Sequence, residues 1–303
     1  MRVLGCLVIA ACGGAKSPAP ALPTGEQRAE LDGVEISYQV RGHGPACVVM
    51  PGGPGLSADY LRSAELEQHV TAIYIDPAGT GASQDLPSNE SYSIRRDVAI
   101  LEALRKDLKL ERWCLIGHSY GGLVVLRYAL DNPQHTNGLL LYSTGPSLGE
   151  EWQKQVATSV QMFKDEPWFA AATAAQQAEG QAKNPDELDA AIRAELPLYF
   201  AEWSTRSDEY ADAIAKMKVD FEVARRRPDD KFEVRSELAK LRVPTVIVVG
   251  ERDFMFGPAI GAWLEHDIAR AKLVVIAKAG HFSHIEQPAK FGAAAEVFAK
   301  LLD

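Results

Sequence analysis

The sequence predicts an α/β protein with one mostly parallel sheet, helices on both faces and a helical insertion. Short apolar segments alternate with amphipathic segments at helical spacing, which is typical of a parallel sheet covered by helices. The alternation stops over residues 146–236, where only helical stretches occur, and then resumes. The length of 303 residues fits one large α/β domain that carries such an insertion.

Composition and charge exclude several other classes of protein. The hydrophobic content of 47% is ordinary for a folded chain, which excludes disordered, collagen-like and coiled-coil proteins. Asp and Glu outnumber Lys and Arg by 41 to 32, so no nucleic-acid partner is expected. No apolar run reaches the roughly 18 residues of a membrane-spanning helix. The 4 cysteines do not make a disulfide scaffold.

The first 25 residues differ from the rest of the chain. Arg2 and the apolar stretch 3–11 predict a signal peptide over residues 1–11, and the letters IAAC at 9–12 resemble a bacterial lipobox in which Cys12 is acylated. Residues 12–25, rich in Gly, Pro and Ala, predict a flexible linker. We therefore expect an exported lipoprotein, periplasmic or at the cell surface, whose one membrane contact is this anchor. An ordinary cleaved signal or a frayed N-terminus is the alternative.

The first part of the predicted core covers residues 26–145. Val34, Ile36 and Tyr38 alternate with polar residues, as in a half-buried antiparallel pair with the segment 27–31. Continuous apolar segments predict four buried strands, at 46–50, 71–75, 113–116 and 138–142. Apolar residues at helical spacing predict two helices, at 94–108 and 120–130.

Residues 146–236 predict a helical cap inserted into the core. They contain stretches rich in Ala, Gln, Glu and Lys, with aromatic residues that are expected mostly to pack between cap helices. The core resumes over residues 237–303. Its predicted elements are strands at 245–249 and 273–276 and helices near 258–268 and 290–302.

The segment Gly117-His118-Ser119-Tyr120-Gly121 carries the chemistry. It matches G-x-S-x-G, and it follows a predicted strand and opens a predicted helix, as this motif requires for a nucleophilic serine. Residues 145–149 also match after a strand, but the segment that follows them is polar and would not lie against the sheet. Ser119 is therefore the predicted nucleophile. Ser147 is assigned to a turn at the start of the cap that could line the pocket.

A serine nucleophile needs a base and an acid that orients the base, and after this motif the acid precedes the histidine in the chain. Asp253 follows the predicted strand 245–249, and His281 follows the strand 273–276. Both therefore lie at carboxyl ends of strands, where open α/β sheets place their sites. We predict Asp253 and His281 for these roles, with Glu251 as the rival acid and His284 as the rival base.

Stabilisation of an oxyanion requires two N–H donors. Tyr120, directly after the nucleophile, is predicted to supply one. The loop PGGPG at 51–55 follows a buried strand, and its glycines let backbone N–H groups approach a ligand. Gly53 is the predicted second donor, and Gly52 is the alternative.

Two cysteines, Cys47 and Cys114, fall inside predicted strands. We interpret them as two small buried hydrophobic residues. They could instead face each other on neighbouring strands, but a sequence does not reveal disulfide geometry.

Together these motifs resemble the α/β-hydrolase superfamily and, within it, the proline iminopeptidase-like (prolyl aminopeptidase) branch. The resemblance runs from about residue 25 to the C-terminus. It rests on five segments in order, PGGPG at 51–55, DPAGTGAS at 76–83, GHSYGG at 117–122, GERD at 250–253 and GHFSHIEQP at 280–288. It implies an eight-stranded sheet, a helical cap over the site and no cofactor, and no metal site is predicted.

The chain departs from the usual pattern of that branch at three places. Pro51 stands where the branch usually has His, and Pro77-Ala78 stand where it often has Gln-Arg. Phe254 stands where some members carry an acid after the catalytic Asp.

The resemblance also suggests where substrate binds. In aminopeptidases of this branch, acidic residues of the cap or near the catalytic Asp bind the free amine of the substrate. Glu195 and Glu202 are the acidic cap residues that this suggests, with Trp203 beside the second. Phe254 and Ser147 complete the predicted substrate-binding residues.

These observations predict a serine hydrolase that forms an acyl-enzyme with a small molecule or short peptide. The leading hypothesis is an aminopeptidase that releases an N-terminal residue. The alternatives are a carboxylesterase or lactonase, or a non-catalytic lipid-anchored binding protein on a hydrolase fold. Ser119 argues against epoxide hydrolases and haloalkane dehalogenases, which use Asp as nucleophile. The oligomeric state is not predicted.

Overall fold

The computed structural model describes residues 22–227 and 231–302. The predicted signal peptide, the predicted lipid attachment at Cys12 and most of the predicted linker lie outside the described residues. Within the described ranges, no helix is long and apolar enough to cross a membrane.

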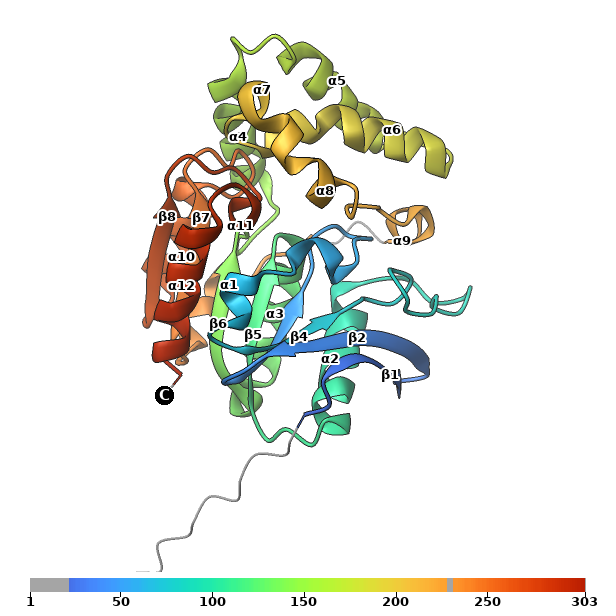
Figure 1. Cartoon of the computed structure of the whole chain (residues 1–303), viewed down its shortest axis with the longest axis vertical. Helices are drawn as coiled ribbons and strands as arrows, with labels where there is room; N and C mark the ends of the chain where they lie inside the picture. The colour runs from blue at the N-terminus through green and yellow to red at the C-terminus, as the bar shows by residue number, and fades with distance from the viewer. Residues whose placement is uncertain (1–21, 228–230, 303) are drawn as a thin grey trace, which may run out of the picture.

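Eight strands form one sheet in the order β1-β2-β4-β3-β5-β6-β7-β8 (Figure 1). The pairs β1–β2 and β2–β4 are antiparallel, and the other pairs are parallel. The strands are β1 (Gly25–Leu31), β2 (Val34–Gly42), β3 (Ala46–Met50), β4 (Thr71–Ile75), β5 (Trp113–His118), β6 (Thr136–Tyr142), β7 (Thr245–Gly250) and β8 (Ala271–Ile276). The predicted fold class is confirmed.

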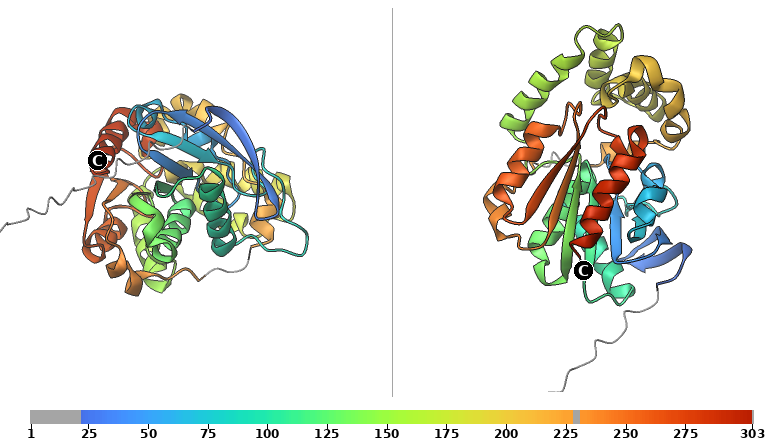
Figure 2. Two further views of the ribbon diagram at one scale, coloured as in Figure 1. Left: turned by 90° about the horizontal axis from the view of Figure 1, so that it is seen from below. Right: turned by 60° about the vertical axis from the view of Figure 1, so that its left-hand side comes forward.

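Helices cover both faces of this sheet (Figure 2). One face carries α2 (Ile94–Asp107), α3 (Tyr120–Asp131) and α10 (Pro258–Asp267), and the other carries α1 (Ala64–Glu67) and α12 (Pro288–Lys300). Because successive strand residues point to opposite faces, Val48 and Met50 join the first apolar core while Cys47 and Val49 join the second. Both faces of the central strands are therefore buried.

The insertion stands above the core as a set of short helices (Figure 1). Its α-helices are α4 (Glu150–Ser159), α5 (Phe169–Glu179), α6 (Pro185–Glu195), α7 (Trp203–Arg206), α8 (Ala211–Ile214) and α9 (Phe221–Arg225). The described residues between 146 and 236 contain no strand, only an isolated antiparallel bridge between Ser147 and Glu233. Two backbone hydrogen bonds flank this bridge, Leu148 N–H to the Phe232 carbonyl and Val234 N–H to the Pro146 carbonyl, each 3.0 Å long. They hold the two ends of the insertion side by side.

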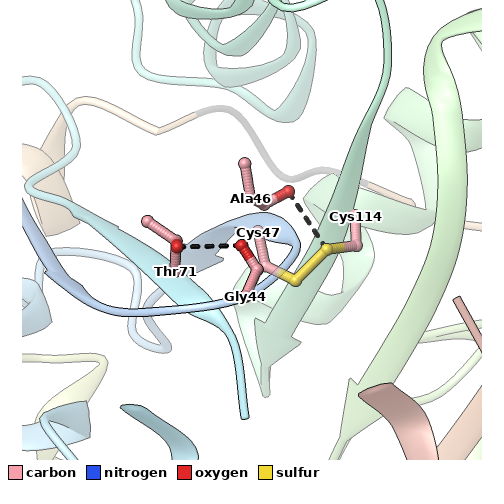
Figure 3. Close-up of a disulfide and its surroundings, with 5 residues drawn as sticks. All are labelled: Gly44, Ala46, Cys47, Thr71 and Cys114. Atoms are coloured by element: carbon pink, nitrogen blue, oxygen red, sulfur yellow. Dashed lines mark hydrogen bonds between the residues drawn. A yellow bond between two sulfur atoms is a disulfide. The ribbon is translucent and has the colours of Figure 1, made fainter. Parts of the chain in front are cut away.

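A disulfide joins Cys47 of β3 to Cys114 of β5 (Figure 3). The two residues are register partners on adjacent parallel strands, and their Cα atoms lie 4.3 Å apart. The interpretation of these cysteines as two unlinked hydrophobic residues was wrong, because the register between the strands sets them opposite each other. The bond ties together the strands that lead to the PGGPG loop and to Ser119.

Candidate active site

Ser119 lies on a sharp turn between β5 and α3. Its φ of +52° is in the left-handed region, which non-glycine residues rarely adopt outside functional sites. The turn leaves no room for a side chain at the second residue before the serine or at the second residue after it. A Cβ on Gly121 would lie 2.3 Å from the Met50 carbonyl oxygen, and one on Gly117 would lie 2.5 Å from the Gly121 carbonyl oxygen. The two glycines of the motif are thus required by backbone packing.

Asp253 and His281 meet next to this turn, from the loops after β7 and β8. His281 Nδ1 donates to Asp253 Oδ2 over 3.0 Å, and both side chains are buried. The other carboxylate oxygen accepts from the N–H groups of Met255 (3.0 Å) and Phe256 (3.1 Å). Burial alone would raise the pKa of Asp253, but the His281 ring and these hydrogen bonds hold it below its usual range. An ionised Asp253 keeps the proton on Nδ1, so His281 Nε2 is left as the basic nitrogen.

The rival acid and the rival base are engaged elsewhere. The exposed Glu251 accepts a hydrogen bond from Lys278 N–H at the surface (3.1 Å). His284 is buried, and its Nε2 donates to the Tyr60 carbonyl over 2.8 Å while its Nδ1 accepts from the Tyr142 hydroxyl over 2.8 Å. Burial lowers the pKa of His284 to about 4. Neither ring nitrogen is available to a nucleophile.

A cavity of about 660 Å³ separates these loops from the cap. Ser119, His281 and Gly53 line it on the core side. Neither the Ser119 hydroxyl nor His281 Nε2 makes a hydrogen bond to the described part of the chain, so both face the cavity without a protein partner. Apolar residues line much of the rest, namely Leu188, Ile192, Leu196, Met217, Val219 and Phe221. Across residues 22–227 and 231–302, no cluster of His, Cys, Asp and Glu is suited to hold a metal ion.

The PGGPG loop distinguishes the two possible oxyanion donors. Gly52 N–H donates to the Tyr60 hydroxyl over 2.7 Å, so it is not free to bind an oxyanion. The N–H groups of Gly53 and Tyr120 donate to no acceptor among the described residues. The geometry therefore favours Gly53 over Gly52 as the partner of Tyr120.

A buried relay of hydrogen bonds connects this loop to His281. The Tyr60 hydroxyl donates to His118 Nδ1 over 2.7 Å, and His118 Nε2 lies 3.0 Å from the His281 carbonyl. Because a carbonyl only accepts, the proton of His118 is on Nε2, which leaves Nδ1 as the acceptor for Tyr60. Burial, together with the neighbouring His281, lowers the pKa of His118 well below its usual range, so the ring is neutral. The sequence pattern assigned no role to Tyr60 or His118.

Two acidic side chains of the cap line the same cavity. Glu195 at the end of α6 is only 3% exposed; Tyr199 Oη donates weakly to its Oε1 (3.4 Å), and its Oε2 has no partner among the described residues. Burial and the nearby charge of Glu179 raise the pKa of Glu195 to about 8. Burial also raises the pKa of Glu179. Glu195 was among the predicted cap residues, whereas Glu179 was not, because no motif marks it.

Four other residues predicted to bind substrate do not line this cavity, namely Glu202, Trp203, Phe254 and Ser147. Glu202 pairs with Arg206 (3.6 Å), and Trp203 packs on Phe200. Phe254 is buried within the cap contacts, and Ser147 is buried at the base of the cap, where it accepts from Gly149 N–H (3.0 Å). The structure thus places these four side chains outside the lining of the cavity, because side-chain direction within short cap helices depends on packing that the sequence does not show.

Comparison with known proteins agrees with this geometry. Residues 45–288 match the alpha/beta hydrolase fold family. The chain is 27% identical to a proline iminopeptidase of Saccharolobus solfataricus over 273 residues, which cover 84% of each chain. Among solved structures, it resembles a proline iminopeptidase of Mycobacterium smegmatis (TM-score 0.72, 21% identity, 91% of this chain and 98% of the other). It also resembles an esterase of Rhodococcus (TM-score 0.75, 19% identity, 92% and 100%).

Proposed function

We propose that this chain, which belongs to the alpha/beta hydrolase fold family and is a hydrolase, is an aminopeptidase. In this proposal it removes the N-terminal residue of a short peptide through an acyl-enzyme on Ser119. The observation that carries the proposal is the buried carboxyl of Glu195, with Glu179 beside it, in the cavity that Ser119 and His281 also line. The similarity to proline iminopeptidases supports a proline-like or other apolar N-terminal residue.

The chemistry follows from the positions of the five catalytic groups. Ser119 Oγ attacks the scissile carbonyl while His281 Nε2 takes its proton, and Asp253 stabilises the charged ring. The N–H groups of Gly53 and Tyr120 bind the oxyanion of the tetrahedral intermediate. His281 then gives the proton to the departing amine, which leaves the acyl group on Ser119. A water molecule, deprotonated by His281, hydrolyses the acyl-enzyme and releases the N-terminal residue as a free amino acid.

The acidic end of the cavity suits an ammonium group. A buried carboxyl with one unpartnered oxygen lacks both a donor and a counter-charge, and the N-terminus of a peptide supplies both. Burial and the charge of Glu179 raise the pKa of Glu195, and a bound ammonium would lower it by forming an ion pair with the carboxylate. The apolar residues along the cavity would hold the first side chain.

The test compares three kinds of substrate. Prolyl and leucyl p-nitroanilides carry the free amine, their N-acetyl derivatives lack it, and p-nitrophenyl acetate needs no cap contact. We expect cleavage of the free aminoacyl anilides and loss of activity on N-acetylation. Glu195→Gln should lower kcat/KM for the free anilides by about 10- to 100-fold, the value of a charged hydrogen bond. It should leave acetate hydrolysis within about threefold.

Controls separate this effect from general damage. Glu202→Gln alters a cap glutamate outside the cavity and should leave cleavage of the free aminoacyl anilides and of the acetate ester unchanged. Ser119→Ala should abolish both activities and labelling by a fluorophosphonate. Hydrolysis of the ester without any cleavage of the aminoacyl anilides would refute the aminopeptidase proposal.

A second candidate function is hydrolysis of small esters or lactones. The apolar lining of the cavity favours it, because an acyl chain without an amine would fit along the same residues. The similarity in fold to the Rhodococcus esterase is compatible with it. In that case Glu195→Gln would raise or preserve ester hydrolysis, since an ionisable carboxyl in an apolar acyl site would be replaced by a neutral amide.

We also propose that the protein is exported and anchored through a lipid on Cys12. Two features support this. The segment 1–12 has the pattern of a lipoprotein signal, and a buried structural disulfide such as Cys47–Cys114 is typical of oxidising compartments.

A further inference from the structure

The loop that carries His281 is bonded to the cap segment that carries the proposed amine-binding residue. His281 N–H donates to the Tyr199 carbonyl over 2.8 Å. The contact is so close that a Cβ on Gly280 would lie 2.3 Å from the same carbonyl oxygen. Tyr199 ends the turn η4 (Leu196–Tyr199), which directly follows Glu195. The cap therefore contacts the core at His281, the proposed base, and at Gly280 directly before it.

One buried carboxylate spans this contact. Glu286, 2% exposed, lies in α11 (Ser283–Glu286). Its Oε2 accepts from Gly280 N–H over 2.6 Å, and its Oε1 accepts from Ala201 N–H over 2.7 Å. The first bond holds the His281 loop, and the second holds the cap. No other side chain in the described part of the chain accepts from both segments.

The surroundings of Glu286 give its side chain no part in the chemical step. Arg206 of the cap helix α7 donates to the Glu286 backbone carbonyl over 3.4 Å. Burial raises the pKa of Glu286 to about 7, and the two N–H hydrogen bonds and the positive charge of Arg206 limit this rise. Asp253 is the nearby negative group and already serves His281. Glu286 does not line the cavity, so it does not touch substrate. Its two hydrogen bonds hold the His281 loop and the cap segment in position.

We propose that Glu286 is a positioning residue that fixes Glu195 of the cap at a set distance from His281 of the core. This inference rests on the aminopeptidase proposal, because it concerns where the substrate amine is held relative to the scissile bond. A substrate anchored by its amine needs that distance to be correct, since small displacements of a reacting group are costly. A small ester that is held only by the core does not need it.

The experiment uses the full chain and two variants. Glu286→Gln keeps the size of the side chain but presents an NH₂ group to one of the two N–H donors, and Glu286→Asp is too short to reach both. We expect each to lower the ratio of kcat/KM for leucyl p-nitroanilide to that for p-nitrophenyl acetate by at least tenfold. Acetate hydrolysis itself should stay within about threefold. Glu296→Gln, an exposed glutamate of α12 paired with Lys300, is the matched control.

A merely structural role would give a different result. All rates are measured well below the unfolding temperature of each variant, and an equal loss on both substrates would overturn the proposal. Hydrogen exchange supplies a readout that does not depend on the substrate. The amides of Ala201, Gly280 and His281 should exchange faster in Glu286→Gln, and unchanged exchange would overturn the proposal. If the wild type cleaves no anilide, the aminopeptidase proposal fails, while the exchange data still decide whether Glu286 joins the cap to the core.

Discussion

Glu195 has an environment unlike that of a surface glutamate. It is almost fully buried, it faces Glu179, and one of its oxygens has no partner among the described residues. An ionised carboxyl in such an environment destabilises the folded state. Sites that bind a charged ligand often keep a group of this kind, because the ligand completes its interactions.

The pH dependence of the free energy of unfolding should reveal the effect of burying Glu195. The pKa of Glu195 is about 8 in the fold against a usual 4.5, so the folded chain holds a proton that the unfolded chain releases in this range. Its contribution to stability is therefore fully present below pH 4.5 and is lost as the pH rises to about 8. Relative to Glu195→Gln, the wild type should lose up to about 1.4 kcal/mol per pH unit in that window. Urea unfolding from pH 4 to pH 9 measures this difference, and a constant difference would contradict it.

Residues with a motif could be recognised from the sequence, and residues without one could not. Ser119, Asp253 and His281 each follow an apolar strand in a recognisable segment, and the structure brings Asp253 and His281 into contact beside the Ser119 turn. Glu179, Tyr60 and the bridging role of Glu286 depend on contacts between distant segments. No spacing in the chain encodes those contacts.

The turn between β5 and α3 is the element on which the serine depends. Gly121 packs its Cα against the end of β3, where a Cβ would meet the Met50 carbonyl at 2.3 Å. Backbone atoms on both sides cannot rotate away, so a side chain here would push the helix from the sheet.

Gly121→Ala should therefore reduce activity on every substrate by at least 100-fold and lower the unfolding free energy by about 2 to 3 kcal/mol. Gly180→Ala is the control, because a Cβ there meets nothing within 4 Å and its φ is compatible with alanine. It should leave the unfolding free energy nearly unchanged, and it serves as a control for stability alone because Gly180 lines the cavity. Normal activity of Gly121→Ala in a thermal and kinetic comparison would show that the turn tolerates displacement.

The order and pairing of the strands could not be predicted from sequence patterns, although the strands themselves could. The predicted strands and helices fall close to the observed ones; α2, for instance, spans Ile94–Asp107 within the predicted 94–108. Pairing between β3 and β5 was not visible, and it decides that Cys47 faces Cys114. Short cap helices are harder still, because their few residues carry no clear period.

At the scale of the whole molecule, a disulfide-linked core carries the cap, and we propose that a lipid on Cys12 tethers them. Intact mass spectrometry of the protein extracted from membranes of its own host tests the tether and the disulfide together. We expect a mature chain that begins at a lipid-modified Cys12 and gains two hydrogen atoms on reduction, from the Cys47–Cys114 bond. An unmodified Cys12, or cleavage elsewhere, would contradict the lipoprotein proposal. A mass that does not change on reduction would show that the two thiols are unlinked.

The sequence by itself determined that the chain is a hydrolase, because the motif around Ser119 needs particular residues at the end of a strand. It also determined the α/β class, since apolar periodicity reflects burial directly. Tertiary structure alone decided which cap acids reach the cavity, which loop N–H remains free and how the cap is fastened to the His281 loop. Those features arise where segments far apart in the chain meet, and their energies depend on burial and distance, which a linear pattern does not contain.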